Sequence, residues 1–340
     1  MNDKIVFCEN MLWHFYFGAN GICVSKLQQN PNTATVFDSG YFDFDVISDG
    51  DRTIHLICQD KEGSVIYFLY TDSVWHKKVI FLSKTKTAYT KSFKLISNKS
   101  LVCAAYTIVK DSRPMIVFQY LNASAPPLVI DYVTSAPRSF FVLPKSNFDI
   151  DIFYQNLDGF LGYKTYIWSK KDFSPFNSIC ENCSSPFAVS ERKVAALSGS
   201  RIVFFENGIQ TDIYNSYGSD LSAPSCQIIN GEMFVIWQQG SLTFYSKQLQ
   251  TGFSGASRFL SPLSMPLLFE IKTSAKDTSY IYAYQVQNKI NLLSPSSALS
   301  VEDFFAKKEG YASLSEDDKL DEILKRIDAI YSLLNERKRF

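Results

Sequence analysis

The chain has 340 residues, of which 46% are hydrophobic and 15% aromatic, and its 34 Lys and Arg residues balance 34 Asp and Glu residues. This hydrophobic content is ample for a core and excludes disorder of the whole chain. The neutral charge balance argues against a nucleic-acid partner, because proteins that bind phosphate backbones concentrate basic charge.

A three-residue signpost recurs along the chain: a small polar residue, a small or flexible residue, then Pro or Tyr. Successive signposts are 38 to 49 residues apart, and runs rich in Ile, Val, Phe and Tyr follow each of them. Such a period, with several short strands in each unit, is typical of a β-propeller. We therefore predict an all-β fold, a seven-bladed β-propeller of four-stranded blades over residues 1–300, with six and eight blades as alternatives. The signposts are Ser39-Gly40-Tyr41, Thr87-Ala88-Tyr89, Ser135-Ala136-Pro137, Ser184-Ser185-Pro186, Ser222-Ala223-Pro224 and Ser264-Met265-Pro266.

The second repeat shows the blade pattern most clearly. Four apolar runs joined by short polar turns predict one up-and-down sheet. Shifted by 96 residues, the pattern of the second and third strands returns at 150–155 and 161–168. The four predicted strands of the second repeat are 42–47, 53–59, 65–70 and 75–82.

The composition changes near residue 300, after which we predict a linker over 301–315 and a helix over 316–340. Apolar residues in this last segment are spaced alternately three and four residues apart, which is the seam of a coiled coil. A helix this short needs its apolar stripe buried, either against another subunit or against the same chain. The spacing favours a homo-oligomer, with packing inside the same chain as the alternative. The predicted interface residues are Leu320, Ile323, Leu324, Ile327, Ile330, Tyr331 and Leu334.

The seven cysteines predict a reducing compartment. Their number is odd, they form no regular framework, and no export signal is recognised at the N-terminus, so we expect a cytoplasmic protein. No apolar run approaches the roughly 18 residues of a membrane span. Cys180 and Cys183 form the single Cys-x-x-Cys motif, and a structural zinc site needs about four ligands. We favour an inert pair of thiols over metal or redox chemistry, and expect neither a metal nor a cofactor.

Two sets of residues are candidates for ligand binding. Alternation along a strand places Asp43 and Asp45 on one face, where they can point into a central channel. Asp149 and Asp151 are two further candidate carboxylates near this channel. Solvated carboxylates at strand ends are the alternative interpretation. The aromatic candidates can stack on sugars or pack between blades; they are Trp75, Trp168 and Trp237, with Tyr163 and Tyr166.

No catalytic residue is assigned. The three histidines lie in or beside predicted strands, and none belongs to a recognisable nucleophile motif. They are His14, His55 and His76.

The run from Ile54 to Leu82 resembles blades of sialidase-like and lectin-like propellers, as a repeat type and not as a close family match. Shared features are the second strand that begins Ile54-His55, a glycine-containing turn, an aromatic third strand and a fourth strand that begins with Trp75. The sialidase Asp-box is missing from the sequence. The resemblance implies the propeller fold.

From these observations we expect a non-catalytic binding or scaffolding propeller for a protein or glycan ligand, oligomerised by the C-terminal coiled coil. One alternative is a glycoside hydrolase-like enzyme that uses the four aspartates near the channel. The other is an intracellular lectin, of which aromatic pockets between blades would be the sign.

Overall fold

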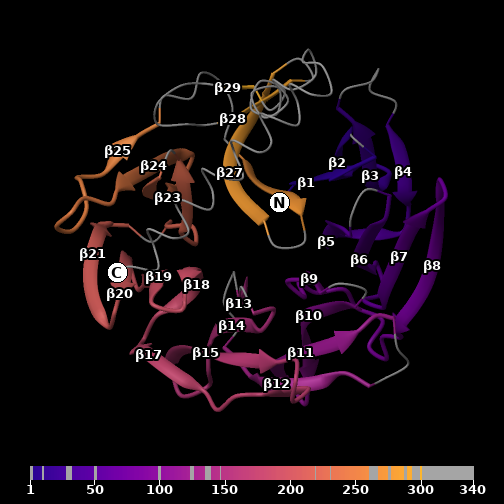
Figure 1. Cartoon of the computed structure of the whole chain (residues 1–340), viewed down its shortest axis with the longest axis horizontal. Coiled ribbons are helices and arrows are strands. Elements are labelled where there is room, and N and C mark those ends of the chain that lie inside the picture. The colour runs from indigo at the N-terminus through magenta and orange to yellow at the C-terminus, as the bar shows by residue number, and fades with distance from the viewer. Residues whose placement is uncertain are drawn as a thin grey trace, which may run out of the picture. The chain divides into compact units, whose positions relative to one another are not determined.

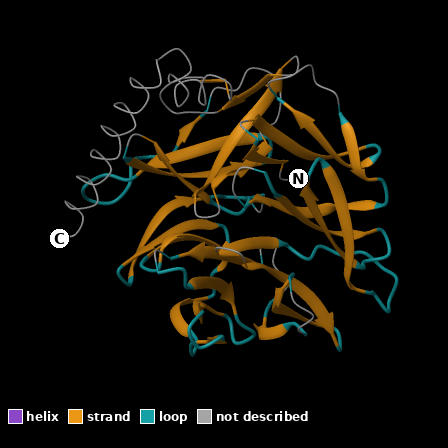
Figure 2. Ribbon diagram, turned by 45° about the vertical axis from the view of Figure 1, so that its right-hand side comes forward, coloured by secondary structure: helices purple, strands orange, loops and turns teal. Residues whose placement is uncertain are grey.

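The computed structural model describes residues 3–300, apart from 10, 28–32, 50–51, 99–100, 123–125, 135–138, 146, 219, 230, 260–266, 275–276, 287–288 and 293–298. The chain divides into two compact units, Met1–Ala283 and Tyr284–Phe340. In the described part the regular structure consists of β-strands joined by loops (Figure 2), so the predicted all-β fold is confirmed. A helix long and apolar enough to cross a membrane is not found among these residues. The predicted C-terminal helix and its interface residues lie outside them.

The first unit is a succession of antiparallel sheets, each made mostly of four strands that are consecutive in the chain. Figure 1 shows the sheets of this unit following one another in chain order. The first two groups of strands are β1 (Asp3–Cys8), β2 (Met11–Gly18), β3 (Gly21–Lys26) and β4 (Ala34–Phe37), then β5 (Gly40–Ser48), β6 (Ile54–Asp60), β7 (Val65–Thr71) and β8 (Val74–Phe81). The third group is β9 (Lys94–Asn98), β10 (Leu101–Lys110), β11 (Arg113–Tyr120) and β12 (Leu128–Tyr132).

The next sheet departs from the four-strand pattern because a fifth strand joins it. It has the order β13-β14-β15-β16, and β17 also pairs with β15. Its strands are β13 (Phe140–Pro144), β14 (Ile150–Gln155), β15 (Phe160–Ile167), β16 (Asp172–Phe173) and β17 (Asn177–Glu181). The two sheets after it are β18 (Ser184–Ser190), β19 (Lys193–Ser198), β20 (Arg201–Glu206) and β21 (Ile209–Asn215), then β22 (Ser225–Ile229), β23 (Glu232–Gln239), β24 (Leu242–Lys247) and β25 (Ser257–Arg258).

The two ends of the first unit meet in one sheet. Strand β26 (Leu267–Ser274) pairs with β27 (Asp277–Val286) on one side and, in parallel, with β1 on the other. This parallel register places Lys4 opposite Glu270. In the second unit, β28 (Lys289–Leu292) and β29 (Leu299–Ser300) form an antiparallel pair.

The apolar residues explain why the sheets stack against one another. In β6 nearly every residue is buried, whereas most residues of β8 are exposed. A strand buried on both faces reads as a continuous apolar run, as the second repeat does between Ile54 and Cys58. Neighbouring sheets accordingly share cores: β1–β4 with β5–β8, β5–β8 with β9–β12, β9–β12 with β13–β16, and β13–β17 with the two sheets that follow.

Three of the signposts mark the start of a new sheet. Strand β5 begins at Gly40, β18 begins at Ser184, and β22 begins directly after Pro224. Small residues and proline suit the crossover between two sheets, because proline cannot donate to a ladder of hydrogen bonds. The repeated four-stranded sheets are therefore confirmed, and the number of seven blades stays a prediction.

Candidate functional site

A pocket of about 420 Å³ lies between the sheet of β13–β17 and the sheet of β18–β21; we call it the inter-sheet pocket. One wall comes from β15 and β17, and the other from the β18–β19 turn, β19, β20 and the turn after β20. The Asn207-Gly208 pair in that last turn has positive φ at both residues (52° and 81°), as a tight hairpin turn requires. The lining residues are Tyr163, Asn177, Ser178, Ile179, Glu191, Arg192, Val194, Phe205, Asn207 and Gly208.

A close approach of two strands forms the β15–β17 wall. Gly162 of β15 pairs with Ser178 of β17, and a Cβ atom at Gly162 would lie 2.1 Å from the carbonyl oxygen of Asn177. Only glycine leaves room for this approach. The result is that Tyr163 and Asn177, which pair with each other across the two strands, both line the pocket.

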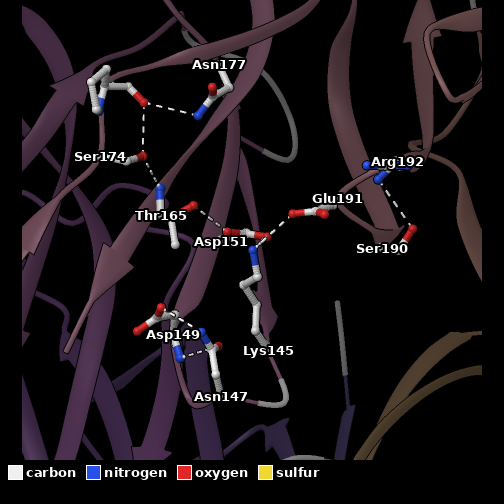
Figure 3. A network of polar contacts seen from close by, with 11 residues as sticks. Lys145, Asn147, Asp149, Asp151, Thr165, Ser174, Asn177, Ser190, Glu191 and Arg192 are labelled. Carbon is white, nitrogen blue, oxygen red and sulfur yellow. Dashed lines mark hydrogen bonds and ion pairs between the residues drawn. The ribbon is translucent and has the colours of Figure 1, made fainter. Parts of the chain in front are cut away.

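A network of charges lies beside the pocket (Figure 3). The ammonium group of Lys145 lies 3.4 Å from Asp151 Oδ2 and 3.0 Å from Glu191 Oε2, so these two carboxylate oxygens lie at most about 6.4 Å apart. Asp151 has no exposed surface, and the hydroxyl group of Thr165 donates a hydrogen bond of 2.7 Å to it. Burial raises the pKa of Asp151, against the opposing effects of Thr165 and Lys145.

Arg192 differs from these groups because its guanidinium makes no hydrogen bond or ion pair with any residue that the structure describes. Its backbone N–H donates to the Ser190 hydroxyl, which fixes the turn that carries it (Figure 3). Burial, followed by the charges of Glu191 and Asp151, raises the pKa of the Tyr163 phenol, so this hydroxyl stays protonated at neutral pH. The pocket therefore combines an available cation, hydrogen-bonding groups and apolar surface.

The predicted pair Asp43 and Asp45 connects β5 to the start of the next sheet. The backbone N–H of Ser92 donates 3.0 Å to Asp43, and that of Leu95 donates 2.6 Å to Asp45. Asp45 is fully buried and also lies 3.2 Å from the ammonium group of Lys4. These carboxylates link two sheets to each other, and neither of them lines the inter-sheet pocket.

Lys4 and Asp45 belong to a buried cluster of four charges, which we call the closure cluster: Lys4, Asp45, Lys94 and Glu270. Glu270 is bonded to Lys4 and lies 2.8 Å from the ammonium group of Lys94. Burial lowers the pKa of Lys4, but the carboxylates of Asp45 and Glu270 outweigh it and raise the pKa above its ordinary value. In this cluster the positive charges of the two lysines equal in number the negative charges of Asp45 and Glu270.

The remaining predicted residues have structural surroundings. Asp149 accepts hydrogen bonds from Asn147 and from the backbone of Trp168. Trp75 and Trp168 are half-buried against aromatic neighbours, and Trp237 has no exposed surface, so it offers no face to a ligand. These three rings fill the sheets' apolar interior, and of the four aspartates the structure brings only Asp151 close to the inter-sheet pocket.

Of the residues that carry the pocket, reasoning from the sequence named Tyr163 as an aromatic candidate and missed Glu191 and Arg192. The one local signal was Asn207-Gly208, a turn signature that marks a hairpin and not a ligand. Among the described residues, no three His, Cys, Asp or Glu side chains gather in a way that could hold a metal ion.

No family model matches the sequence, and no curated protein matches it. Solved structures do match. A puromycin hydrolase has 8% identity and a TM-score of 0.57, over 88% of this chain and 53% of that one. The Aleuria aurantia lectin, in complex with a methyl fucoside, has 10% identity and a TM-score of 0.47, over 88% and 94% of the two chains. A polysaccharide lyase, an ulvan lyase, has 8% identity and a TM-score of 0.49, over 75% and 81%.

At identities of 10% or less, these likenesses bear on the fold alone. The TM-scores for the lectin and the lyase are too low to support a closer relation. Together with the succession of four-stranded sheets, the comparisons support the β-propeller repeat type, and they show no close family.

Proposed function

We propose that this chain is a non-catalytic binding propeller that recognises a glycan in the inter-sheet pocket. The observation that carries the proposal is the mixed lining: the ring of Tyr163 and the apolar Val194 and Phe205 line the same pocket as Arg192. Binding pockets for small ligands are mostly apolar, with a few polar groups that fix orientation. A sugar ring presents the same mixture of apolar face and hydroxyl rim.

Arg192 is the expected anchor. Its guanidinium has five N–H donors in a rigid fork, which suits two neighbouring hydroxyl or carboxylate oxygens. Because these donors are not used by the described residues, binding would not have to break an existing ion pair. The proposal also includes seven blades, a coiled-coil oligomer of several such propellers and a cytoplasmic location. These three parts rest on the sequence.

The test is a glycan array with the full chain, followed by calorimetric titration of a bound glycan. We expect Arg192→Ala to weaken binding at least tenfold, and Arg192→Lys to weaken it less because the charge remains. Arg258→Ala is the matched control, since Arg258 is an exposed arginine of β25 outside the pocket, and it should bind as the unaltered chain does. Failure to bind any glycan, or undiminished binding by Arg192→Ala, would contradict the proposal.

The second candidate function is hydrolysis of a glycosidic bond. Asp151 and Glu191 favour it, because retaining enzymes place their carboxyl groups about 5–5.5 Å apart and inverting enzymes about 6.5–9.5 Å apart. Two features favour binding instead. Asp151 has no exposed surface to meet a substrate, and Lys145 lies within bonding distance of both carboxylates. Release of free sugar from a bound glycan, lost in Glu191→Gln while binding persists, would establish the hydrolase.

A further inference from the structure

Strand β8 (Val74–Phe81) is the last strand of its sheet, in which the order is β5-β6-β7-β8. It pairs with β7 on one side, and none of the strands that the structure describes pairs with it on the other. Figure 1 shows β8 at the outer edge of this sheet. About half of the backbone N–H and C=O groups of such a strand point away from its single neighbour. The edge of β8 therefore has room for one more strand.

Among the described outer strands of the first unit, β8 is the longest. It has eight residues, whereas β21 has seven, β12 and β17 have five, β4 has four, and β16 and β25 have two. Short edge strands are one means by which proteins avoid pairing with other chains, and β8 lacks this protection. It also exposes apolar side chains, since Val74 is 52% exposed and Val79 49%. The edge thus combines backbone groups with apolar surface.

The same edge is basic. Residues 72–87 contain four lysines and one aspartate. Two of the lysines, Lys77 and Lys78, are adjacent and exposed on β8. The ammonium group of Lys77 lies 4.7 Å from the centre of the Phe37 ring, and that of Lys78 donates 3.0 Å to the carbonyl oxygen of Leu121. Neither forms an ion pair with a carboxylate in the described part of the chain, so both positive charges are available to a partner.

A second copy of β8 would fit this edge poorly. Two copies related by a twofold axis pair antiparallel, and an axis between Lys77 and Lys78 would bring the lysines of the two copies opposite each other. Like charges directly opposite each other destabilise a strand pair, whereas opposite charges stabilise it. Adjacent residues of a strand point to opposite faces, so one lysine lies on each face of the sheet. A partner strand with two adjacent acidic residues would meet both.

We propose that β8 binds an extended segment of a partner protein as an added strand. The segment has two adjacent acidic residues opposite Lys77 and Lys78, with apolar β-branched residues on either side that pack beside Val74 and Val79. In this mode of binding, backbone hydrogen bonds supply affinity and the side chains supply specificity. The surface is separate from the inter-sheet pocket, because none of the residues that line the pocket belongs to β8.

The test measures the binding of two fluorescein-labelled peptides to the full chain by fluorescence anisotropy. The peptide SVTVEDVTVS has an acidic pair between β-branched residues, and SVTVKKVTVS has a lysine pair in its place. We expect the acidic peptide to bind at least tenfold more tightly. A chain with Lys77→Glu and Lys78→Glu should show the reverse preference, because it has opposite charges only with the lysine peptide. Binding of neither peptide, equal binding of both, or an unreversed preference would overturn the proposal.

The matched control is a second pair of adjacent exposed lysines, Lys170 and Lys171, in the turn between β15 and β16. A chain with Lys170→Glu and Lys171→Glu should prefer the acidic peptide as the unaltered chain does. Hydrogen exchange followed by mass spectrometry separates strand addition from attraction between charges alone. With the acidic peptide bound, amides of β8 should exchange several-fold more slowly and those of β21 at the same rate. Binding that leaves the exchange of β8 unchanged would contradict strand addition.

Discussion

Buried polar side chains in this chain differ in the contacts that compensate for the hydration that they lose on burial. Asp45 has a lysine and a backbone N–H, so its charge is satisfied. Lys91 is 1% exposed, and its ammonium group has no hydrogen-bond partner in the described part of the chain; it lies 3.4 Å from the centre of the Tyr89 ring. Burial lowers its pKa to about 8, against the attraction of Asp43. Strand alternation predicted that Asp43 and Asp45 share a face, but their partners come from the two neighbouring sheets and have no local signal.

At the scale of single residues, His55 predicts how the stability of the fold depends on pH. Its Nδ1 lies 2.6 Å from the Tyr67 hydroxyl. Among the described residues Nε2 has no hydrogen-bond partner, and the carboxylate of Asp49 lies 3.8 Å from it. Burial lowers the pKa of His55 from 6.5 to about 4, so the folded protein holds the ring neutral. As the pH falls from 6.5 to 4, the unfolded chain binds a proton that the folded chain does not, and up to about 3 kcal/mol of stability is lost.

The measurement is the free energy of unfolding in urea at several pH values. His55→Gln should flatten the decline of this free energy between pH 6.5 and pH 4. The matched control, His76→Gln, alters an exposed histidine in the neighbouring strand β8 and should keep the slope of the unaltered chain. An unchanged slope in His55→Gln would show that other groups cause the acid sensitivity.

At the scale of elements, the strands of the second repeat were predicted to within two residues at each end. We expected 42–47 and 65–70, and the structure has β5 as Gly40–Ser48 and β7 as Val65–Thr71. Apolar runs and turn residues act locally, so a single sequence records them. The inter-sheet pocket lies between two sheets, and β17 enters it through the close approach at Gly162. Which strands meet across sheets depends on packing, so the sequence predicted the strands and missed the pocket.

The C-terminal helix is the predicted element that lies beyond the described residues. Its apolar stripe, with Ile323 and Ile330 on the seam, predicts that the full chain self-associates, and the width of the stripe weakly favours three or four strands over two. Light scattering should give a multiple of 38.6 kDa for the full chain and a monomer for a chain truncated at residue 312. A full chain with Ile323→Asp and Ile330→Asp should also be monomeric. Monomeric masses for both the full and the truncated chain would contradict the prediction.

At the scale of the whole first unit, the closure cluster connects strands that are remote in sequence. Glu270→Gln should remove about 3 kcal/mol of unfolding free energy, because it removes the carboxylate that the ammonium groups of Lys4 and Lys94 share. Adding Lys94→Met to this variant restores the charge balance, because it removes one positive charge and leaves Lys4 paired with Asp45 at 3.2 Å. The double variant should therefore lose less stability than the two single variants together, as measured by urea unfolding. Strictly additive losses would show that the four groups do not act as one cluster.

The parallel pairing of β1 with β26 has a consequence for biosynthesis. The ribosome makes Lys4 long before Glu270, which lies 266 residues later. At roughly 5–20 residues per second, roughly 15–50 s pass before the partner strand exists. During that interval one edge of β1 has unpaired N–H and C=O groups, which other strands can occupy. The nascent chain is thus most prone to incorrect strand pairing at β1, the first strand to be synthesised. A chaperone that binds there would protect the chain most effectively.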